Sequence, residues 1–171
     1  RVSIDTTKAK VAAAAVEAGA GMINDVTGLR GDPDMIKIAA EADVPVCIMH
    51  MQGSPKTMQK SPRYPDDVCY EITNYFRQRI EEACAGGVRE CQLLLETGLG
   101  FGKNLQHILE ILRRFSEFRA LGRPLLIGAS RKSFIGMALD LEPGDRLEAS
   151  IASAVLAVAG GADIVRAHDV K

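Results

Sequence analysis

Six short apolar segments alternate with helix-forming segments along this chain of 171 residues, and this alternation restricts the fold more than any other feature. The apolar segments are residues 2–4, 22–23, 44–49, 93–95, 124–127 and 164–165. They are apolar on both faces, which is typical of parallel strands that helices cover on each side. The sequence therefore predicts an α/β protein with six parallel strands and right-handed helical crossovers.

The segments between the apolar runs carry helix signals. We expect helices at residues 7–18, from Asp32-Pro33 to about residue 42, and at residues 65–85, 104–121, 134–139 and 145–159. Glycines end three of them, at Gly19, Gly86-Gly87 and Gly122. Residues 50–64 form a long loop, and loops of that length inside a compact domain are usually functional.

The strand ends favour a barrel over a doubly wound sheet. Nearly every expected strand ends in a polar residue, namely Asp5, Asn24, His50, Glu96, Ser130 and His168. A (β/α)₈ barrel builds its site from the ends of many strands, whereas a doubly wound sheet concentrates it at one switch point. No Gly-x-Gly-x-x-Gly follows the first strand, which weakens a dinucleotide-binding interpretation. We expect one domain over residues 1–171, an incomplete TIM (β/α)₈ barrel with six strands in sequential order.

Charge and cysteine content exclude several classes of protein. The net charge is −1, so no basic excess exists to drive binding to nucleic acid or to a membrane surface. No apolar run approaches the length that spans a bilayer. The four cysteines, Cys47, Cys69, Cys84 and Cys91, form no Cys-x-x-Cys pair. We expect buried, reduced thiols, which fit a cytoplasmic protein.

Cationic and hydroxyl side chains follow the last two strands. The fifth strand is followed by Gly128-Ala129-Ser130-Arg131-Lys132-Ser133, and the sixth by Arg166-Ala167-His168-Asp169. Arg166 and His168 are two positions apart, so in an extended segment they point to the same side. Taken singly, residues 130–132 are also explained by an exposed basic turn, and Arg166 and His168 by a salt-bridged pair. Together, at two strand ends, Lys132, Arg166 and His168 predict a phosphate or pyrophosphate site.

Two earlier strand ends present an acid and an amide. Asp5 alone is better explained as the N-cap of the next helix. Asn24 repeats the arrangement one βα unit later, where the next helix starts farther on. A carboxylate and an amide together bind an edge of alternating donors and acceptors, such as that of a pterin or purine.

The glycine-rich turn after Glu96 has two explanations. Gly98, Gly100 and Gly102 flank Phe101, and either form a flexible turn that ends at the Asn104 cap or let the backbone approach a flat ligand. No Lys-Ser/Thr closes it as in a Walker loop. In Met49-His50-Met51-Gln52, the histidine has no acidic or cysteine partner nearby, so we expect no metal ligand there.

In their order along the chain, six motifs resemble those of the dihydropteroate synthase family. They are residues 3–6, 23–25, 49–53, 98–104, 130–133 and 166–171. The resemblance implies a TIM barrel of which this chain supplies strands three to eight, without the first two strands and the final helix. It also implies the condensation of 4-aminobenzoate with 6-hydroxymethyl-7,8-dihydropterin pyrophosphate, which releases pyrophosphate in folate biosynthesis. The family uses Mg²⁺, and a homodimer is expected at full length.

The same resemblance assigns roles to individual residues. It implies that the pterin is held by Asp5, Asn24, Glu96 and Lys132, with Met49 and Phe101 packed around it and Gly128 leaving room for the ring. Arg166 and His168 would bind the pyrophosphate, while Ser130 and Arg131 would lie near the aminobenzoate. The catalytic set is Asp5, Lys132, Arg166 and His168. No metal ligand is expected in this chain, because the Mg²⁺ ligand of the family belongs to the missing N-terminal part.

Two departures from the family pattern leave alternatives open. Glu96-Thr97 stands where the family has Asp-Pro, so the carboxylate is one methylene farther out. Without the remaining barrel elements, the fragment itself is expected to be inactive and to bind pterin weakly or not at all. The alternatives are a pterin-binding methyltransferase that acts on methyltetrahydrofolate, which needs no pyrophosphate site, and a non-catalytic remnant.

Overall fold

Six parallel strands pair in the order in which they occur in the sequence, from β1 to β6. They are β1 (Ser3–Asp5), β2 (Met22–Asp25), β3 (Val46–Met49), β4 (Leu93–Glu96), β5 (Leu125–Ile127) and β6 (Ile164–Val165). The computed structural model describes residues 2–170, so Arg1 and Lys171, the last residue of the 166–171 motif, lie outside the described residues. The sequential order confirms the incomplete barrel and excludes a doubly wound sheet, whose strand order reverses at its switch point.

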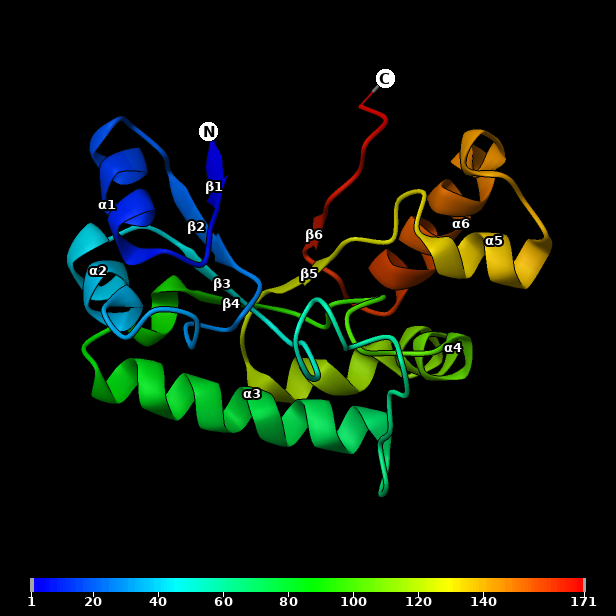
Figure 1. Cartoon of the computed structure of the whole chain (residues 1–171), viewed down its shortest axis with the longest axis horizontal. Helices are drawn as coiled ribbons and strands as arrows, with labels where there is room; N and C mark the ends of the chain where they lie inside the picture. The colour runs from blue at the N-terminus through cyan, green and yellow to red at the C-terminus, as the bar shows by residue number, and fades with distance from the viewer. Residues whose placement is uncertain (1, 171) are drawn as a thin grey trace.

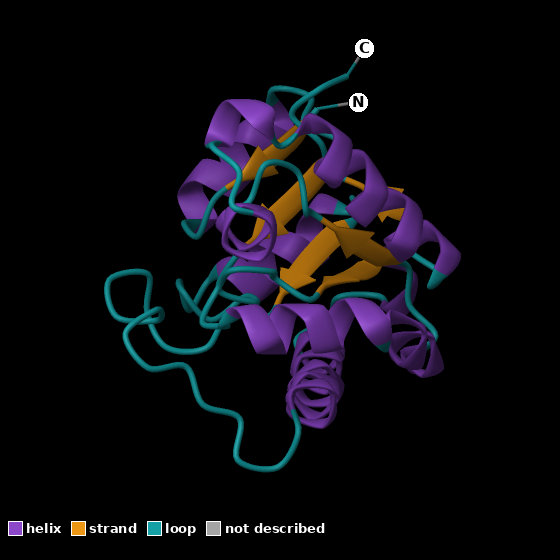
Figure 2. Ribbon diagram, turned by 90° about the vertical axis from the view of Figure 1, so that its right-hand side faces the viewer, coloured by secondary structure: helices purple, strands orange, loops and turns teal. Residues whose placement is uncertain are grey.

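The helices lie along the outer side of the curled sheet (Figures 1 and 2). They are α1 (Ala9–Glu17), α2 (Met35–Ala42), α3 (Val68–Ala85), α4 (Leu105–Arg113), α5 (Ser133–Leu139) and α6 (Leu147–Ala159). Three 3₁₀ segments accompany them, η1 (Glu90–Gln92), η2 (Phe115–Leu121) and η3 (Pro143–Asp145). At the top of Figure 1 the side of the sheet between β1 and β6 is open, and the two ends of the chain lie there.

The single helix predicted over residues 104–121 is divided at Arg114 into α4 and η2. In a 3₁₀ segment the side chains at i and i+3 lie on the same line. This brings both Phe115 and Phe118 into the core, where their ring centroids are 5.9 Å apart. The 3₁₀ geometry therefore aligns the two aromatic rings on the side of η2 that faces the core.

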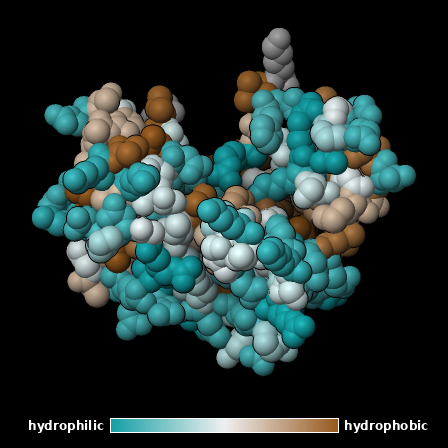
Figure 3. Space-filling model, in the orientation of Figure 1, coloured by the Kyte–Doolittle hydropathy of each residue, from teal (hydrophilic) through white to brown (hydrophobic). Residues whose placement is uncertain are grey.

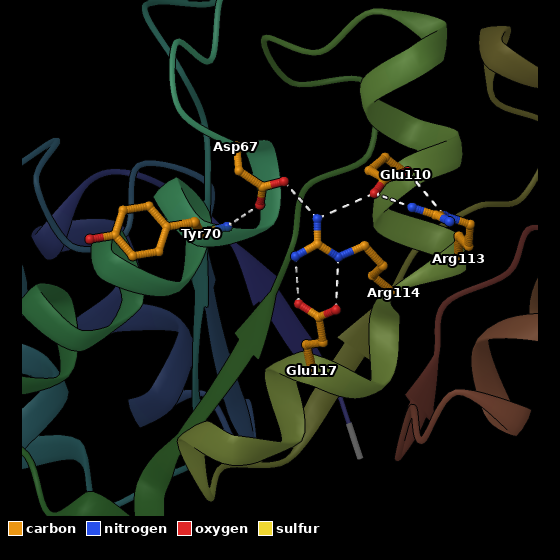
Figure 4. A network of polar contacts seen from close by, with 6 residues as sticks. All are labelled: Asp67, Tyr70, Glu110, Arg113, Arg114 and Glu117. Carbon is orange, nitrogen blue, oxygen red and sulfur yellow. Dashed lines mark hydrogen bonds and ion pairs between the residues drawn. The ribbon is translucent and has the colours of Figure 1, made fainter.

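Arg114 joins the break in this helix to the start of α3 (Figure 4). Its guanidinium donates to Asp67 at 2.6 Å and to both carboxylate oxygens of Glu117 at 2.7 and 2.8 Å. Asp67 also caps α3, because its other oxygen accepts from the Tyr70 amide at 2.7 Å. The end of the long loop is thus fixed to the helical layer.

Asp32 caps a different helix from the one that the sequence predicts. Its carboxylate accepts from the backbone amide of Ala9, the first residue of α1, at 2.9 Å. Thr6 accepts from the amide of Lys8, and within residues 2–170 Asp5 makes no side-chain hydrogen bond. The cap interpretation of Asp5 is therefore wrong, and its carboxylate is available at the strand end.

The two faces of the sheet form separate apolar cores. Outward-facing strand residues pack with the helices in the large core, which includes Ile23, Ile48, Leu95 and Ile127. Inward-facing residues form a small cluster inside the barrel, Cys47, Leu94 and Leu126, with Met22 packed against it. The small cluster is the floor beneath the strand ends.

The structure bears on the expected burial of the cysteines and on the absence of a membrane-spanning segment. All four cysteines are free thiols, and Cys47 and Cys69 are buried as predicted, but Cys91 is exposed in η1. Cys91 lies in the 3₁₀ segment before β4, outside the buried strand, and its side chain faces solvent. Within residues 2–170, no helix is long and apolar enough to cross a membrane.

Candidate functional site

Strand alternation places the predicted residues on one face. Asp5 is opposite Asn24, and Met49 is opposite Glu96 in the sheet register. Side chains two positions apart in a strand face the same side, so the inward cluster at mid-strand continues to the strand ends. The inward positions at the carboxyl ends are Asp5, Asn24, Met49, Glu96, Gly128 and Arg166. The register thus places these six residues on the inner face, at one edge of the sheet.

Three of these residues, Asp5, Asn24 and Arg166, line a cavity of about 630 Å³ between the first and the last strand. Its lining includes Asp5 and Asn24 on one side and Arg166 and Asp169 on the other. Figure 3, in the orientation of Figure 1, shows a notch at the top of the molecule, on the open side between the first and the last strand. A cavity of this size holds a small organic ligand.

Three polar atoms at this edge are buried and have no partner. They are Asn24 Oδ1, Glu96 Oε2 and Thr97 Oγ1; within residues 2–170 the other such atoms are Glu71 Oε1 and Arg123 Nε. Buried polar atoms in native proteins normally find partners, so each exception needs an explanation. An amide oxygen and a carboxylate oxygen accept hydrogen bonds. The inner face is therefore suited to a ligand that presents N–H donors.

Glu96 forms an ion pair with Arg166 across β5. The Glu96 side chain is 1% exposed and that of Arg166 is 43% exposed. Burial raises the pKa of Glu96, and the nearby positive charges of Arg166 and Lys132 oppose this shift. A Cβ atom at Gly128 would lie 2.9 Å from Arg166 Nη2, so the absent side chain makes room for this guanidinium.

Lys132 lies over the ring of Phe101, with Nζ 5.0 Å from the ring centroid. The same ammonium donates to the backbone carbonyl of Leu99. Burial lowers the pKa of Lys132 to about 8, with Arg166 adding to the shift and Glu96 opposing it. The lysine is thus a cation that titrates near neutral pH beside a flat aromatic surface.

The glycine-rich turn is a rigid platform rather than a flexible loop. Every carbonyl from Gly98 to Gly102 accepts a hydrogen bond from a side chain. Lys103 donates to the carbonyls of Gly98 and Phe101, and Lys132 donates to that of Leu99. Gln59 donates to Gly100 and Tyr64 to Gly102. Gln59 and Tyr64 come from the long loop, which therefore packs against this turn.

Lys103 is a residue that sequence reasoning missed. It is 2% exposed, and its ammonium contacts Gly98 O and Phe101 O at 3.1 Å each and His50 Nδ1 at 2.9 Å. Burial, and then the Lys103 charge, hold the pKa of His50 well below its usual value, so its neutral ring accepts from the lysine. A lysine after three glycines looks like a solvent-exposed residue, and no sequence pattern distinguished it.

Side chains of the motif at residues 130–133 contact the motif at residues 166–169 directly. Ser130 Oγ lies 3.0 Å from His168 Nδ1 and accepts from the His168 amide at 3.1 Å. Arg131 makes a two-pronged ion pair with Asp169 at 2.8 and 2.9 Å, and also donates to two backbone carbonyls, those of Pro143 and Gly144. The position of Ser130 and Arg131 beside an aminobenzoate stays a prediction. The guanidinium of Arg131 is already bound to Asp169 and to the two carbonyls.

We predict that Lys103→Met destabilises the chain. The substitution leaves three buried acceptors, on His50, Gly98 and Phe101, without their donor, and each costs about 1–3 kcal/mol. Urea unfolding should show a loss of about 3 kcal/mol or more, and trypsin should cut the long loop faster at Lys56, Lys60 and Arg63. The exposed Lys37→Met is the matched control. Equal stability of the two variants would contradict the role of Lys103.

We also predict that Lys132 titrates near pH 8. Its ammonium is present below this pH and is lost as the pH rises through it, as burial requires. Nuclear magnetic resonance of isotope-labelled lysine side chains measures the midpoint. In Glu96→Gln the midpoint should fall, because the carboxylate that stabilises the ammonium is gone. An unchanged midpoint in that variant would show that the two groups do not interact.

Comparison with known proteins points to one family. Residues 1–168 match the family described as pterin binding enzyme. The dihydropteroate synthase of Escherichia coli (strain K12) is 47% identical over 170 residues, which are 99% of this chain and 60% of that protein. The sulfonamide complex of the Yersinia pestis dihydropteroate synthase superposes with a TM-score of 0.95 at 46% identity, over 99% of this chain and 61% of that one.

A further similar structure is that of a ligand complex. It is the Xanthomonas albilineans dihydropteroate synthase in complex with 7,8-dihydropteroate, with a TM-score of 0.91 at 40% identity. The match covers 98% of this chain and 61% of that one. This chain therefore spans about three fifths of the length of these relatives.

Proposed function

This chain belongs to the pterin binding enzyme family, and on that premise we propose that it supplies the pterin and pyrophosphate sites of a dihydropteroate synthase. The observation that carries the proposal is the pair of buried, unpartnered acceptors on Asn24 and Glu96 beside the cations Lys132 and Arg166. This combination suits a ligand with N–H donors at one end and a negative charge at the other.

The pterin half of the site is formed by Asp5, Asn24, Glu96 and Lys132. A carboxylate accepts two N–H bonds from an amino-pyrimidinone edge, and an amide makes one bond of each kind. Lys132 donates to an acceptor on the ring, next to Phe101, whose face it already contacts. Met49, fully buried at the end of β3, closes the floor.

The reaction needs charge stabilisation and no nucleophile from the protein. In the proposed dissociative mechanism, the bond between the exocyclic pterin carbon and the pyrophosphate oxygen breaks first, and pyrophosphate leaves with the electron pair. The carbon becomes a cation, and the amine of 4-aminobenzoate attacks it and loses a proton. Arg166 and His168 stabilise the leaving anion, while the nearby carboxylates stabilise the cation.

Mg²⁺ and the homodimer remain predictions of the family resemblance. Within residues 2–170, no group of three or more His, Cys, Asp and Glu side chains is placed to hold a metal ion. No step of the mechanism is assigned to a metal ion. The aminobenzoate position near Ser130 and Arg131 is likewise part of the proposal.

We predict that Arg166→Ala weakens pyrophosphate binding. Hydrogen bonds to charged groups contribute about 1.5–3 kcal/mol, so the dissociation constant should rise roughly 10- to 100-fold in calorimetric titrations. Arg77→Ala, on the exposed face of α3, removes the same charge far from the site. If both variants lose affinity equally, Arg166 is not a pyrophosphate ligand.

The activity itself is tested by exchanging homologous segments. This chain replaces the matching 170 residues of the Escherichia coli dihydropteroate synthase, and formation of dihydropteroate is measured with both substrates. We expect turnover that Asp5→Asn in the same chimera reduces by at least tenfold, the scale of a lost charge-assisted hydrogen bond. A chimera that melts as cooperatively as the parent enzyme, yet forms no dihydropteroate, would overturn the proposed function.

A further inference from the structure

The Arg166–Glu96 ion pair uses the same guanidinium that the proposed function assigns to pyrophosphate. Arg166 Nη2 donates to Glu96 Oε1, and no other side-chain partner of Arg166 exists among residues 2–170. Glu96 Oε2 has no partner. The anion-binding cation is therefore neutralised by a carboxylate of the chain itself.

The position of the pair depends on side-chain length and on Gly128. Arg166 follows β6 and Glu96 ends β4, so the guanidinium crosses β5 to reach the carboxylate. It crosses above Gly128, where a Cβ would lie 2.9 Å from Nη2 and 3.3 Å from Glu96 Oε1. An aspartate at position 96 would end about 1.5 Å short, the length of one carbon–carbon bond. The contact therefore depends on glutamate at this position.

We propose that Glu96 competes with pyrophosphate for Arg166 and weakens the binding of the anion. The inference rests on the proposed function and deepens it. A guanidinium that is already paired attracts an anion less, and the carboxylate beside it repels the incoming negative charge. Pyrophosphate must draw Arg166 away from Glu96 Oε1, and Arg166, which is 43% exposed, has room to turn.

The competition has a consequence for the end of the reaction. After the bond between pterin and pyrophosphate has broken, Glu96 can pair with Arg166 again. This pairing would shorten the time for which pyrophosphate stays bound. While Arg166 contacts the anion, both oxygens of Glu96 are free to accept N–H bonds from the pterin. Lys132 then remains beside Glu96 as the other cation that lowers the pKa of this carboxylate.

The test compares two substitutions of Glu96 by calorimetric titration with pyrophosphate at pH 7. Glu96→Asp keeps the negative charge and withdraws the carboxylate, so we expect affinity to rise roughly two- to fivefold, the scale of one partly exposed ion pair. Glu96→Gln should raise it at least as much. Asp5→Asn is the charge control, because it removes a carboxylate that is close enough to influence Glu96 but forms no ion pair with Arg166.

The outcomes separate competition from simple electrostatics. If Glu96→Asp binds like the wild-type chain while Glu96→Gln and Asp5→Asn bind alike and more tightly, only charge matters and the proposal is wrong. Weaker binding in either Glu96 variant would also overturn it, because Glu96 would then orient Arg166 for the anion. Pyrophosphate that binds neither wild type nor variants would instead overturn the proposed function.

A measurement without ligand keeps the proposal testable if a Glu96 variant folds poorly. The pKa of the Glu96 carboxyl is followed by carbon resonance in the wild-type chain and in Arg166→Ala. Loss of the paired cation should raise this pKa, since Arg166 lowers it. An unchanged pKa would show that the pair does not form in solution, and the proposed competition would be excluded whatever the binding data.

Discussion

Parallel pairing of six strands in sequential order is the constraint on which the rest of this structure depends. Because side chains alternate along a strand, the pairing sends every second residue inward and gathers the ends of all six strands at one edge. The apolar floor of Cys47, Leu94 and Leu126 and the polar strand ends above it follow from the same alternation. A slip of one residue in any strand would turn its site residue toward the helices.

The site built on this frame has more basic side chains than a buried environment easily accepts, and burial lowers the pKa values of both Lys103 and Lys132. Each of them is compensated by the chain, although in different ways. Lys103 is surrounded by backbone carbonyls and the neutral His50 ring, Lys132 contacts a carbonyl and an aromatic face, and Arg166 pairs with Glu96. Only the last of these partners is itself charged. For this reason Arg166 is the cation whose availability to a ligand the chain most directly controls.

Departures from the sequence predictions have a common physical origin. Asp32 caps α1, 23 residues away, and Arg114 holds the start of α3 while the helix around it changes to a 3₁₀ segment. Both depend on which segments pack side by side, and local propensity contains no such information. The hydrogen bonds from Gln59 and Tyr64 to the glycine-rich turn also join segments that are distant in the sequence. Lys103 is close to the turn in sequence, but no sequence pattern indicates that its side chain is buried there.

The sequence by itself determined the fold class, the strand order and the residues at the strand ends. The local signals are short apolar runs, glycines that end helices, and polar residues after each run. In parallel α/β folds the order of such signals along the chain determines where each strand end lies. Only the tertiary structure decided how these residues contact each other. The approach of Arg166 to Glu96 across Gly128, and the burial of Lys103 against His50, join residues that are 70 and 53 positions apart. Such contacts depend on the curvature of the sheet and on side-chain length, which only the folded chain specifies.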